Sequence, residues 1–175
     1  MQNILEKASK VKLVIFDVDG VLTTGNLNYR PDGTESKTFN VYDGMGLRML
    51  LKSGVDIAII TARQSEVVAK RMRDLEIKYV YQGCNDKVVP YEELKEKLNC
   101  NDEQIAYVGD DLPDLPLLRR VGLGITVPNA PTIMQEYATM VTKTKGGRGA
   151  AREVCEIIMQ AQGTYSAAIK SYLDR

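Results

Sequence analysis

Short apolar runs alternate along the chain with segments of helical periodicity. The first run, Leu13 to Phe16, is entirely apolar and ends at Asp17. Continuous apolar runs of this length, bounded by a turn residue such as glycine, are typical of strands buried on both faces of a parallel sheet. Similar runs predict further strands at 55–60, 79–81, 105–108 and 124–127, with an edge strand at 140–142.

The segments between these runs carry apolar residues three and four positions apart, which predicts helices. We expect helices at 42–53, 65–75, 87–98, 115–121, 131–137 and 151–162, with helical segments also at 1–10 and after Gly163. Asp43 and Asp102 are expected as N-caps of the first helix and of a short turn. Strands alternating with helices predict an α/β fold with a doubly wound, mostly parallel (Rossmann-like) sheet.

One segment, about 23–42, interrupts the alternation. It holds two short segments of roughly alternating polarity around Pro31-Asp32-Gly33-Thr34, which predicts a β-hairpin flap. The flap is too small to be a separate cap domain. We therefore expect a single domain over 1–175, with a C-terminal tail of about 146–175 that starts at a glycine-rich hinge.

Composition limits the partners. The 23 basic and 23 acidic residues balance, which argues against a nucleic-acid partner or an acidic membrane surface. No apolar run approaches the roughly 20 residues that span a bilayer, and residues 1–10 do not resemble a signal peptide. A cytoplasmic protein is the expectation.

The cysteines and histidines narrow the chemistry. Three widely spaced cysteines give neither a disulfide framework nor a CxxC metal pair, and only Cys84 lies near a suspected site loop. The chain has no histidine, which excludes Ser-His-Asp and Cys-His catalysis and the common His-ligated zinc sites. An enzyme with this composition would depend on carboxylates, lysine and a metal.

Asp17 and Asp19 follow the first predicted strand, at the sheet edge where ligands bind in open α/β folds. Residues two apart on an extended chain face the same side, so both carboxylates can point into one cleft. Such a pair is costly to bury without a cation. The tetrapeptide alone is compatible with a metal site and with a solvated turn.

Three more predicted strands end in groups suited to phosphate: Thr61, the loop leading to Lys87, and Asp110 with Asp111. Taken singly, each of these groups also has an ordinary structural interpretation. Thr61 could be a helix N-cap and Lys87 a surface lysine. Asp110-Asp111 could be a turn, and Asp114 a helix cap. Parallel strands end at one edge, so these groups should converge. Mg²⁺ takes carboxylate and phosphate oxygens, and a lysine and helix N-termini bind phosphate.

This set suits phosphoryl transfer. Asp17 could attack phosphorus and form an aspartyl-phosphate, which divides hydrolysis into two easier displacements. Asp19 could protonate the leaving alkoxide and later deprotonate the attacking water. A metal and a lysine would stabilise charge on the transferring group.

The ordered set Asp17-x-Asp19-Gly20, Thr61, Lys87 and Gly109-Asp110-Asp111-x-x-Asp114 resembles the haloacid dehalogenase superfamily of phosphatases. The flap without a cap domain resembles its capless subclass. The resemblance implies catalytic Asp17 and Asp19, phosphate-binding Thr61, Ala62 and Lys87, and Mg²⁺ held by Asp17, the main-chain carbonyl of Asp19 and Asp110, with Asp111 in support. Ala62 stands where the family usually has glycine.

Residues 39–46 and 146–154 further resemble the family of phosphatases for 3-deoxy-D-manno-octulosonate 8-phosphate (KDO 8-phosphate), which serve lipopolysaccharide precursor synthesis. That resemblance implies a homotetramer whose tail reaches a neighbouring subunit's site. Tyr42 stands where the family usually has arginine, so a nine-carbon sialic-acid-type 9-phosphate stays an alternative substrate. Residues suggested for the sugar end are Asn40, Asp43, Arg63 and Arg148. A non-catalytic regulatory or binding subunit is the alternative of another class.

Overall fold

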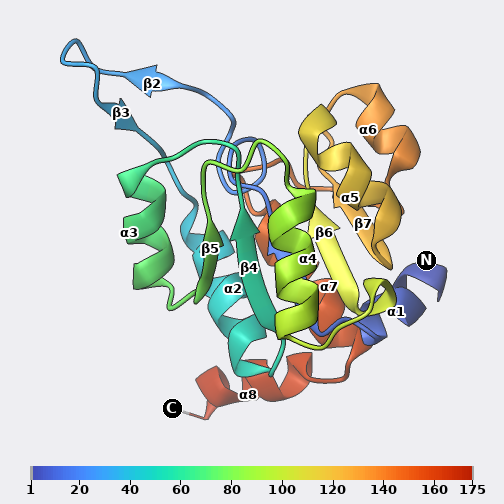
Figure 1. The fold of residues 1–175 in the computed structure, drawn as a ribbon. Helices are drawn as coiled ribbons and strands as arrows, with labels where there is room; N and C mark the ends of the chain where they lie inside the picture. The colour runs from blue at the N-terminus through green and yellow to red at the C-terminus, as the bar shows by residue number, and fades with distance from the viewer. Residues whose placement is uncertain (1, 175) are drawn as a thin grey trace.

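A six-stranded parallel sheet forms the centre of the molecule (Figure 1). The computed structural model describes residues 2–174; Met1 and Arg175, the ends of the predicted domain, lie outside the described residues. The strand order is β5-β4-β1-β6-β7-β8, and every neighbouring pair is parallel. The strands are β1 Leu13–Phe16, β4 Asp56–Ile60, β5 Tyr79–Tyr81, β6 Ile105–Val108, β7 Leu123–Thr126 and β8 Met140–Val141.

The predicted α/β class is confirmed, and the strand order reverses beside β1. From β1 the chain first builds outward through β4 and β5, then returns to the other side of β1 with β6. Such a reversal leaves a crevice at the carboxyl ends of the strands, where α/β proteins bind ligands. The end of β1 therefore lies at the centre of the candidate site.

The helices agree with the predicted ranges to within about two residues at either end. Two short 3₁₀ turns, η1 and η2, precede β6 and α5. The helical elements are α1 Gln2–Ser9, α2 Val41–Lys52, α3 Glu66–Asp74, α4 Val88–Lys97, η1 Asp102–Gln104, η2 Leu112–Asp114, α5 Leu115–Arg120, α6 Thr132–Tyr137, α7 Ala150–Ala161 and α8 Tyr165–Leu173.

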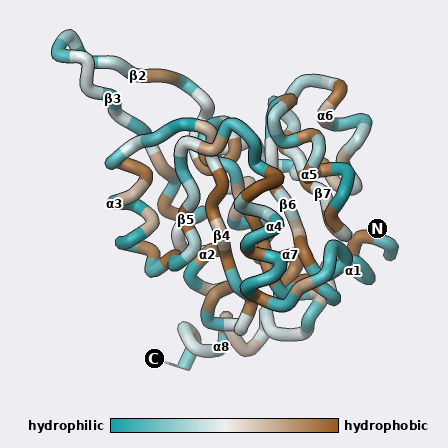
Figure 2. Tube along the Cα trace, viewed as in Figure 1, coloured by the Kyte–Doolittle hydropathy of each residue, from teal (hydrophilic) through white to brown (hydrophobic). Residues whose placement is uncertain are grey.

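The central strands consist largely of hydrophobic residues, as their brown colouring shows (Figure 2), and two hydrophobic clusters cover the two faces of the sheet. On β1, Val14 and Phe16 pack into the core under α2, α3 and α7, while Leu13 and Ile15 pack against α4 and α5. All four are fully buried. Burial on both faces explains why β1 reads as a continuous apolar run instead of an alternating one.

Two predicted helix caps are wrong by one to three residues. Asn40, not Asp43, is the N-cap of α2, and its Oδ1 accepts a hydrogen bond from the Tyr42 backbone N–H at 2.8 Å. Asn101, not Asp102, caps η1. In both places two capping residues lie close together, so composition alone does not choose between them.

The flap is confirmed as a hairpin of very short antiparallel strands, β2 Asn28–Tyr29 and β3 Glu35–Ser36. It projects from the body of the molecule at the end where the sheet's arrowheads point (Figure 1). Within residues 2–174 there is no separate cap domain. No described helix is long and apolar enough to cross a membrane.

The expected glycine-rich hinge is instead a packed turn. The Gly146 N–H donates to Asn129 Oδ1 at 3.0 Å, and the Gly147 N–H donates to the Val21 carbonyl at 2.8 Å. A Cβ on Gly146 would lie 1.6 Å from the Gly20 carbonyl oxygen. The start of the tail is thus packed against the loop that carries Asp19.

The rest of the tail divides into a core helix and a peripheral one. α7 buries Val154, Cys155, Ile158 and Met159 in the core shared with α2. α8 has no fully buried residue. It lies at the opposite end of the molecule from the flap (Figure 1).

Candidate active site

Four strand ends meet at one cavity of about 240 Å³, as their order in the sequence predicts. The predicted catalytic, phosphate-binding and metal-binding residues all line it. The lining residues are Asp17, Asp19, Gly25, Thr61, Ala62, Arg63, Lys87, Asp110, Asp111, Pro113 and Asp114.

Lys87 is a buried residue of this site and not a surface lysine. Its side chain is 4% exposed, and its Nζ lies 2.9 Å from Asp17 Oδ1 and 2.5 Å from Asp114 Oδ1. Burial opposes the charge of Lys87, but the two carboxylates outweigh it and raise the pKa of this group. Lys87 is therefore a fixed positive charge beside Asp17.

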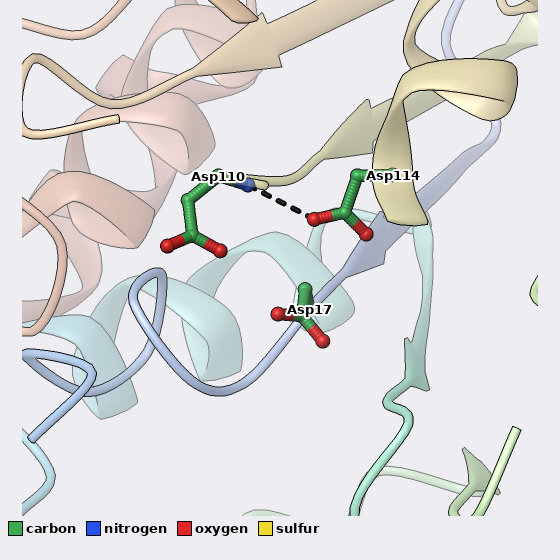
Figure 3. Close-up of side chains that lie close together, drawn as sticks. All are labelled: Asp17, Asp110 and Asp114. Carbon is green, nitrogen blue, oxygen red and sulfur yellow. Dashed lines mark hydrogen bonds between the residues drawn. The ribbon is translucent and has the colours of Figure 1, made fainter. Parts of the chain in front are cut away.

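Asp114 positions this lysine. Asp114 Oδ1 accepts hydrogen bonds from Lys87 and from the Tyr107 hydroxyl at 2.5 Å, and Oδ2 accepts from the backbone N–H groups of Asp110 at 3.0 Å and Asp111 at 3.3 Å. Figure 3 shows the bond to Asp110 as a dashed line. Both oxygens of Asp114 are thus engaged by protein donors. The residue at first read as a helix cap connects α4, β6 and the loop of Asp110.

Three carboxylates gather beside one lysine. Oxygens of Asp17, Asp110 and Asp114 lie within 4.8 Å of one another (Figure 3). Burial and the neighbouring Asp114 raise the pKa of Asp17 to about 6, although Lys87 opposes this. Burial and the charges of Asp17 and Asp114 raise the pKa of Asp110 to about 7. When all three carboxylates are ionised their charge exceeds that of Lys87, and this excess is one cause of both raised pKa values.

This excess charge fits a small divalent cation. Mg²⁺ prefers oxygen ligands and is held by few protein carboxylates. The oxygens of Asp114 are already engaged, so Asp17 and Asp110 are the carboxylates that can offer ligands. A Cβ on Gly20 would lie 1.8 Å from Asp110 Oδ2, so the Asp110 carboxylate lies directly against the backbone that follows Asp19. This neighbourhood agrees with the predicted use of the Asp19 carbonyl.

Asp19 belongs to a second group of charges that the sequence did not reveal. Lys37 Nζ lies 2.5 Å from Asp19 Oδ1, and Arg63 Nε lies 3.6 Å from Asp19 Oδ2. Glu35 Oε2 accepts a hydrogen bond from Arg63 at 2.8 Å, and Glu35 Oε1 lies 3.8 Å from Lys37 Nζ. We call Asp19, Glu35, Lys37 and Arg63 the flap ion cluster.

Thr61 and Ala62 form the wall of the cavity after β4. Thr61 is buried, and its backbone continues the pairing of β4 with β5 through a 3.0 Å hydrogen bond to the Tyr81 carbonyl. It is not the N-cap of α3, because Ser65 occupies that position. Thr61 therefore lines the cavity, and its binding of phosphate stays a prediction.

Three of the four residues suggested for the sugar end do not line the cavity. Asn40 caps α2. Asp43 is buried and accepts hydrogen bonds from the backbone N–H groups of Gly149 and Arg152 at the start of α7, at 3.3 and 2.9 Å. Arg148 is exposed outside the cavity. Arg63 alone lines it and contacts Asp19.

Cys84 lies in the loop that follows β5, near the site but outside the cavity lining. Its thiol donates to the Gln82 carbonyl at 3.6 Å. Burial raises the pKa of this thiol even though Lys87 opposes the shift. The cysteine is held in its neutral form, which is unsuited to nucleophilic attack.

The fold and the arrangement of the site are those of a haloacid dehalogenase-like hydrolase, and the model of that family matches residues 82–154. The 3-deoxy-D-manno-octulosonate 8-phosphate phosphatase KdsC of Yersinia pestis is 44% identical over 95% of this chain and 89% of its own length. The phosphatase of the same name from Escherichia coli K12 is 43% identical over 95% of this chain and 88% of its own length.

Structural similarity extends over nearly the whole chain. A crystal structure of 3-deoxy-D-manno-octulosonate 8-phosphate phosphatase from Moraxella catarrhalis, in complex with a magnesium ion, a phosphate ion and KDO, matches with a TM-score of 0.96 at 43% identity. The match covers 98% of this chain and 99% of that one. The chain belongs to the KdsC family of haloacid dehalogenase-like phosphatases and is a phosphoric monoester hydrolase. The alternative of a non-catalytic subunit is thereby set aside.

Proposed function

We propose that the protein hydrolyses KDO 8-phosphate to KDO and phosphate in a Mg²⁺-dependent reaction through an aspartyl-phosphate, as a step of lipopolysaccharide precursor synthesis. The observation that carries the mechanism is the position of Asp17, which lies at the end of β1, lines the cavity and contacts Lys87 at 2.9 Å. The names of the relatives support the substrate.

In the first step Asp17 is the nucleophile. A carboxylate oxygen of Asp17 bonds to phosphorus while the bond from phosphorus to the sugar oxygen breaks. Asp19 gives its proton to that oxygen, so the sugar leaves as an alcohol. Lys87 and the Thr61–Ala62 wall would bind the phosphoryl oxygens, because both lie on the cavity beside Asp17.

In the second step Asp19 acts as a base. It takes a proton from water, the water oxygen bonds to phosphorus, and the bond to Asp17 breaks with release of phosphate. The Asp17 carboxylate is restored and Asp19 regains its proton. The two aspartates also have different neighbours: Asp17 contacts Lys87, and Asp19 belongs to the flap ion cluster.

Asp17, the Asp19 carbonyl and Asp110 would hold Mg²⁺, with Asp111 in support. When bound, Mg²⁺ supplies positive charge that reduces the repulsion between carboxylate and phosphate. The Asp111 carboxylate accepts a hydrogen bond from the Leu112 N–H at 2.8 Å and so keeps the Asp110–Asp111 loop in place. Asp110 is oriented by its own backbone bond to Asp114.

Arg63 is our candidate for the sugar acid's carboxylate, since it is the only one of the four suggested residues on the cavity. Tyr42, which departs from the family's usual arginine, is exposed and does not line the cavity. The departure therefore leaves the described cavity unchanged. Tyr42 therefore does not decide between the two sugars, and the names of the relatives support KDO 8-phosphate over the nine-carbon alternative.

We also propose that the protein is a homotetramer whose tail reaches a neighbouring subunit's site. Apolar side chains exposed at the flap and the start of α2 support self-association: Leu27, Tyr29, Val41, Tyr42 and Met45. Sedimentation velocity should give the mass of four chains, and a monomer would contradict this part of the proposal.

The test of function is phosphate release from a panel that contains KDO 8-phosphate, a sialic-acid-type 9-phosphate and simple sugar phosphates. We expect the highest kcat/KM on KDO 8-phosphate, and Asp17→Asn should lower kcat by roughly 10⁴-fold or more, since removing a nucleophile has effects of that order. The matched control is Asp32→Asn on the exposed flap turn, which should keep full activity. An Asp17→Asn enzyme with normal turnover would exclude the covalent mechanism.

A further inference from the structure

We propose that Lys37 is a positioning residue that fixes the carboxylate of Asp19 for proton transfer. The inference rests on the proposed function, in which Asp19 is the general acid and base. It assigns a role in catalysis to the flap, a segment that otherwise projects away from the sheet (Figure 1).

The side chain of Lys37 is almost completely buried although the residue follows a short, half-exposed strand. Its side chain is 2% exposed, and its Nζ contacts Asp19 Oδ1 at 2.5 Å. An ammonium group removed from water is costly unless it is paired. Its burial therefore depends on the carboxylates of Asp19 and, at 3.8 Å, Glu35.

The contacts of Asp19 define one orientation of its carboxylate. Lys37 contacts Oδ1, and Arg63 approaches Oδ2 from β4's side of the cavity at 3.6 Å. Glu35 contacts both cations and holds them in place. With one cation at each oxygen, the Asp19 side chain has little freedom of rotation.

The two buried lysines of the site contact different aspartates. Lys87 contacts Asp17 and Asp114, whereas Lys37 contacts Asp19 and Glu35. Lys87 is thus placed to act on the phosphoryl group, and Lys37 to act through the residue that moves the proton. This difference predicts which step each lysine affects.

Orientation of Asp19 matters only when the leaving oxygen needs a proton. A general acid must lie within hydrogen-bond reach of that oxygen. The sugar alkoxide is a poor leaving group and needs protonation, whereas p-nitrophenolate leaves without it. Loss of Lys37 should slow transfer from the sugar phosphate and spare transfer from p-nitrophenyl phosphate.

The experiment measures the first step alone by rapid mixing, because the second step uses Asp19 for every substrate. For Lys37→Met we expect single-turnover cleavage of KDO 8-phosphate to fall on the order of 10²-fold, and single-turnover release of p-nitrophenol to keep its rate within about threefold. Asp19→Asn should show the same selectivity. Arg30→Met, which removes an exposed cation from the same hairpin, should change neither rate.

Three results would overturn the inference. Equal slowing of both substrates by Lys37→Met would give Lys37 a general role in binding or folding, and no slowing would remove it from the reaction. Equal slowing of both substrates by Asp19→Asn would show that Asp19 does not act through protonation of the sugar oxygen, and would remove the premise of this inference. If Lys37→Met fails to fold by circular dichroism, Lys37→Arg, which keeps the charge but shifts the nitrogen, must show the same selective loss on a smaller scale.

Discussion

Asp17 and Asp110 are acids whose protonation depends on the folded state. Their pKa values of about 6 and about 7 lie above the ordinary 3.8 because burial and neighbouring carboxylates disfavour their charged forms. The native protein therefore binds more protons than the unfolded chain between about pH 4 and 7. The stability that these two groups contribute is fully present below pH 3.8 and is lost as the pH rises through 6 and 7.

This pH dependence of stability should change when Mg²⁺ binds. Without Mg²⁺, the free energy of unfolding should fall from pH 5 to pH 8. Saturating Mg²⁺ should raise Tm by roughly 5 °C or more at pH 8 and by much less at pH 5, because protonated carboxylates are poor ligands. Calorimetry at the two pH values measures this difference.

Asp110→Asn tests whether Asp110 is responsible for both the pH dependence of stability and the response to Mg²⁺. It removes a ligand and a repelling charge together, so it should weaken both the decline with pH and the response to Mg²⁺. Asp56→Asn, at an exposed strand start, should behave like the wild type. Equal stabilisation by Mg²⁺ at pH 5 and pH 8 would contradict the assignment of Asp17 and Asp110 as ligands.

The residues of this site that follow strands could be predicted from the sequence, and those placed by tertiary contacts could not. Asp17, Thr61 and Lys87 could be predicted because parallel strands end at one edge. Lys37 gives no local signal, since a lysine after a short exposed strand is ordinarily solvated. The bond of Asp114 to Tyr107 joins two elements whose relative position only the folded sheet defines.

At the scale of elements, the loop of Asp19 depends on the turn that begins the tail. Gly146 lies so close to the Gly20 carbonyl that a methyl group would have to displace backbone. Gly146→Ala is therefore expected to move the aspartate loop, lower kcat by roughly tenfold or more, and reduce the free energy of unfolding by about 1–3 kcal/mol. Phosphate release and urea unfolding measure the two effects.

Gly163→Ala provides the matched control for that prediction. Gly163 has a φ of 72° and has no neighbour within 4 Å of an added Cβ. Its substitution should cost about 1 kcal/mol of backbone strain and leave kcat unchanged. A similar loss of kcat in both variants would show that stability, not the contact with Gly20, explains the effect.

Helices α2 and α7 are joined by a cap supplied from outside the helix. The Asp43 carboxylate of α2 accepts hydrogen bonds from backbone N–H groups at the start of α7. These N–H groups have no acceptor within α7 itself, so Asp43 satisfies them. Asp43→Ala should lower the free energy of unfolding by about 1–2 kcal/mol. Urea unfolding tests this against Asp32→Ala, which should change stability by about 0.5 kcal/mol or less.

The elements themselves were largely predictable, and their exact starts were not. Residues 13–16 and 105–108 are continuous apolar runs, and the structure shows them as neighbouring buried strands. The start of α2 was misplaced because Asn40 and Asp43 are both good caps. The glycine-rich start of the tail resembled a hinge because sequence shows that glycine is permitted but not what packs against it.

At the scale of the whole molecule, the core requires the first helix of the tail, α7, but not the second, α8. α7 contributes Val154, Ile158 and Met159 to the core, whereas α8 buries none of its residues fully. A chain ending at Lys145 should fail to fold. A chain ending at Gly163 should keep a cooperative melting transition, lowered by several degrees.

Circular dichroism melting of the two truncated chains tests this division. The shorter deletion also tests the proposed tetramer, because a tail that completes a neighbour's site should be required for full kcat/KM on KDO 8-phosphate. Full activity of a folded chain ending at Gly163 would contradict that part of the proposal. Folding of the chain ending at Lys145 would contradict the role of α7.

The contact of Gly146 with Gly20 also orders events during synthesis. A nascent chain contains every proposed catalytic, phosphate-binding and metal-binding residue once Asp114 has emerged from the ribosome. The loop that bears Asp19 nevertheless lacks its contact with the Gly146 turn until that turn emerges, and α2 lacks the helix beside it until α7 follows. Nascent chains that lack the Gly146 turn and α7 are therefore expected to be inactive, and hydrolysis is expected to begin only once α7 can pack against α2.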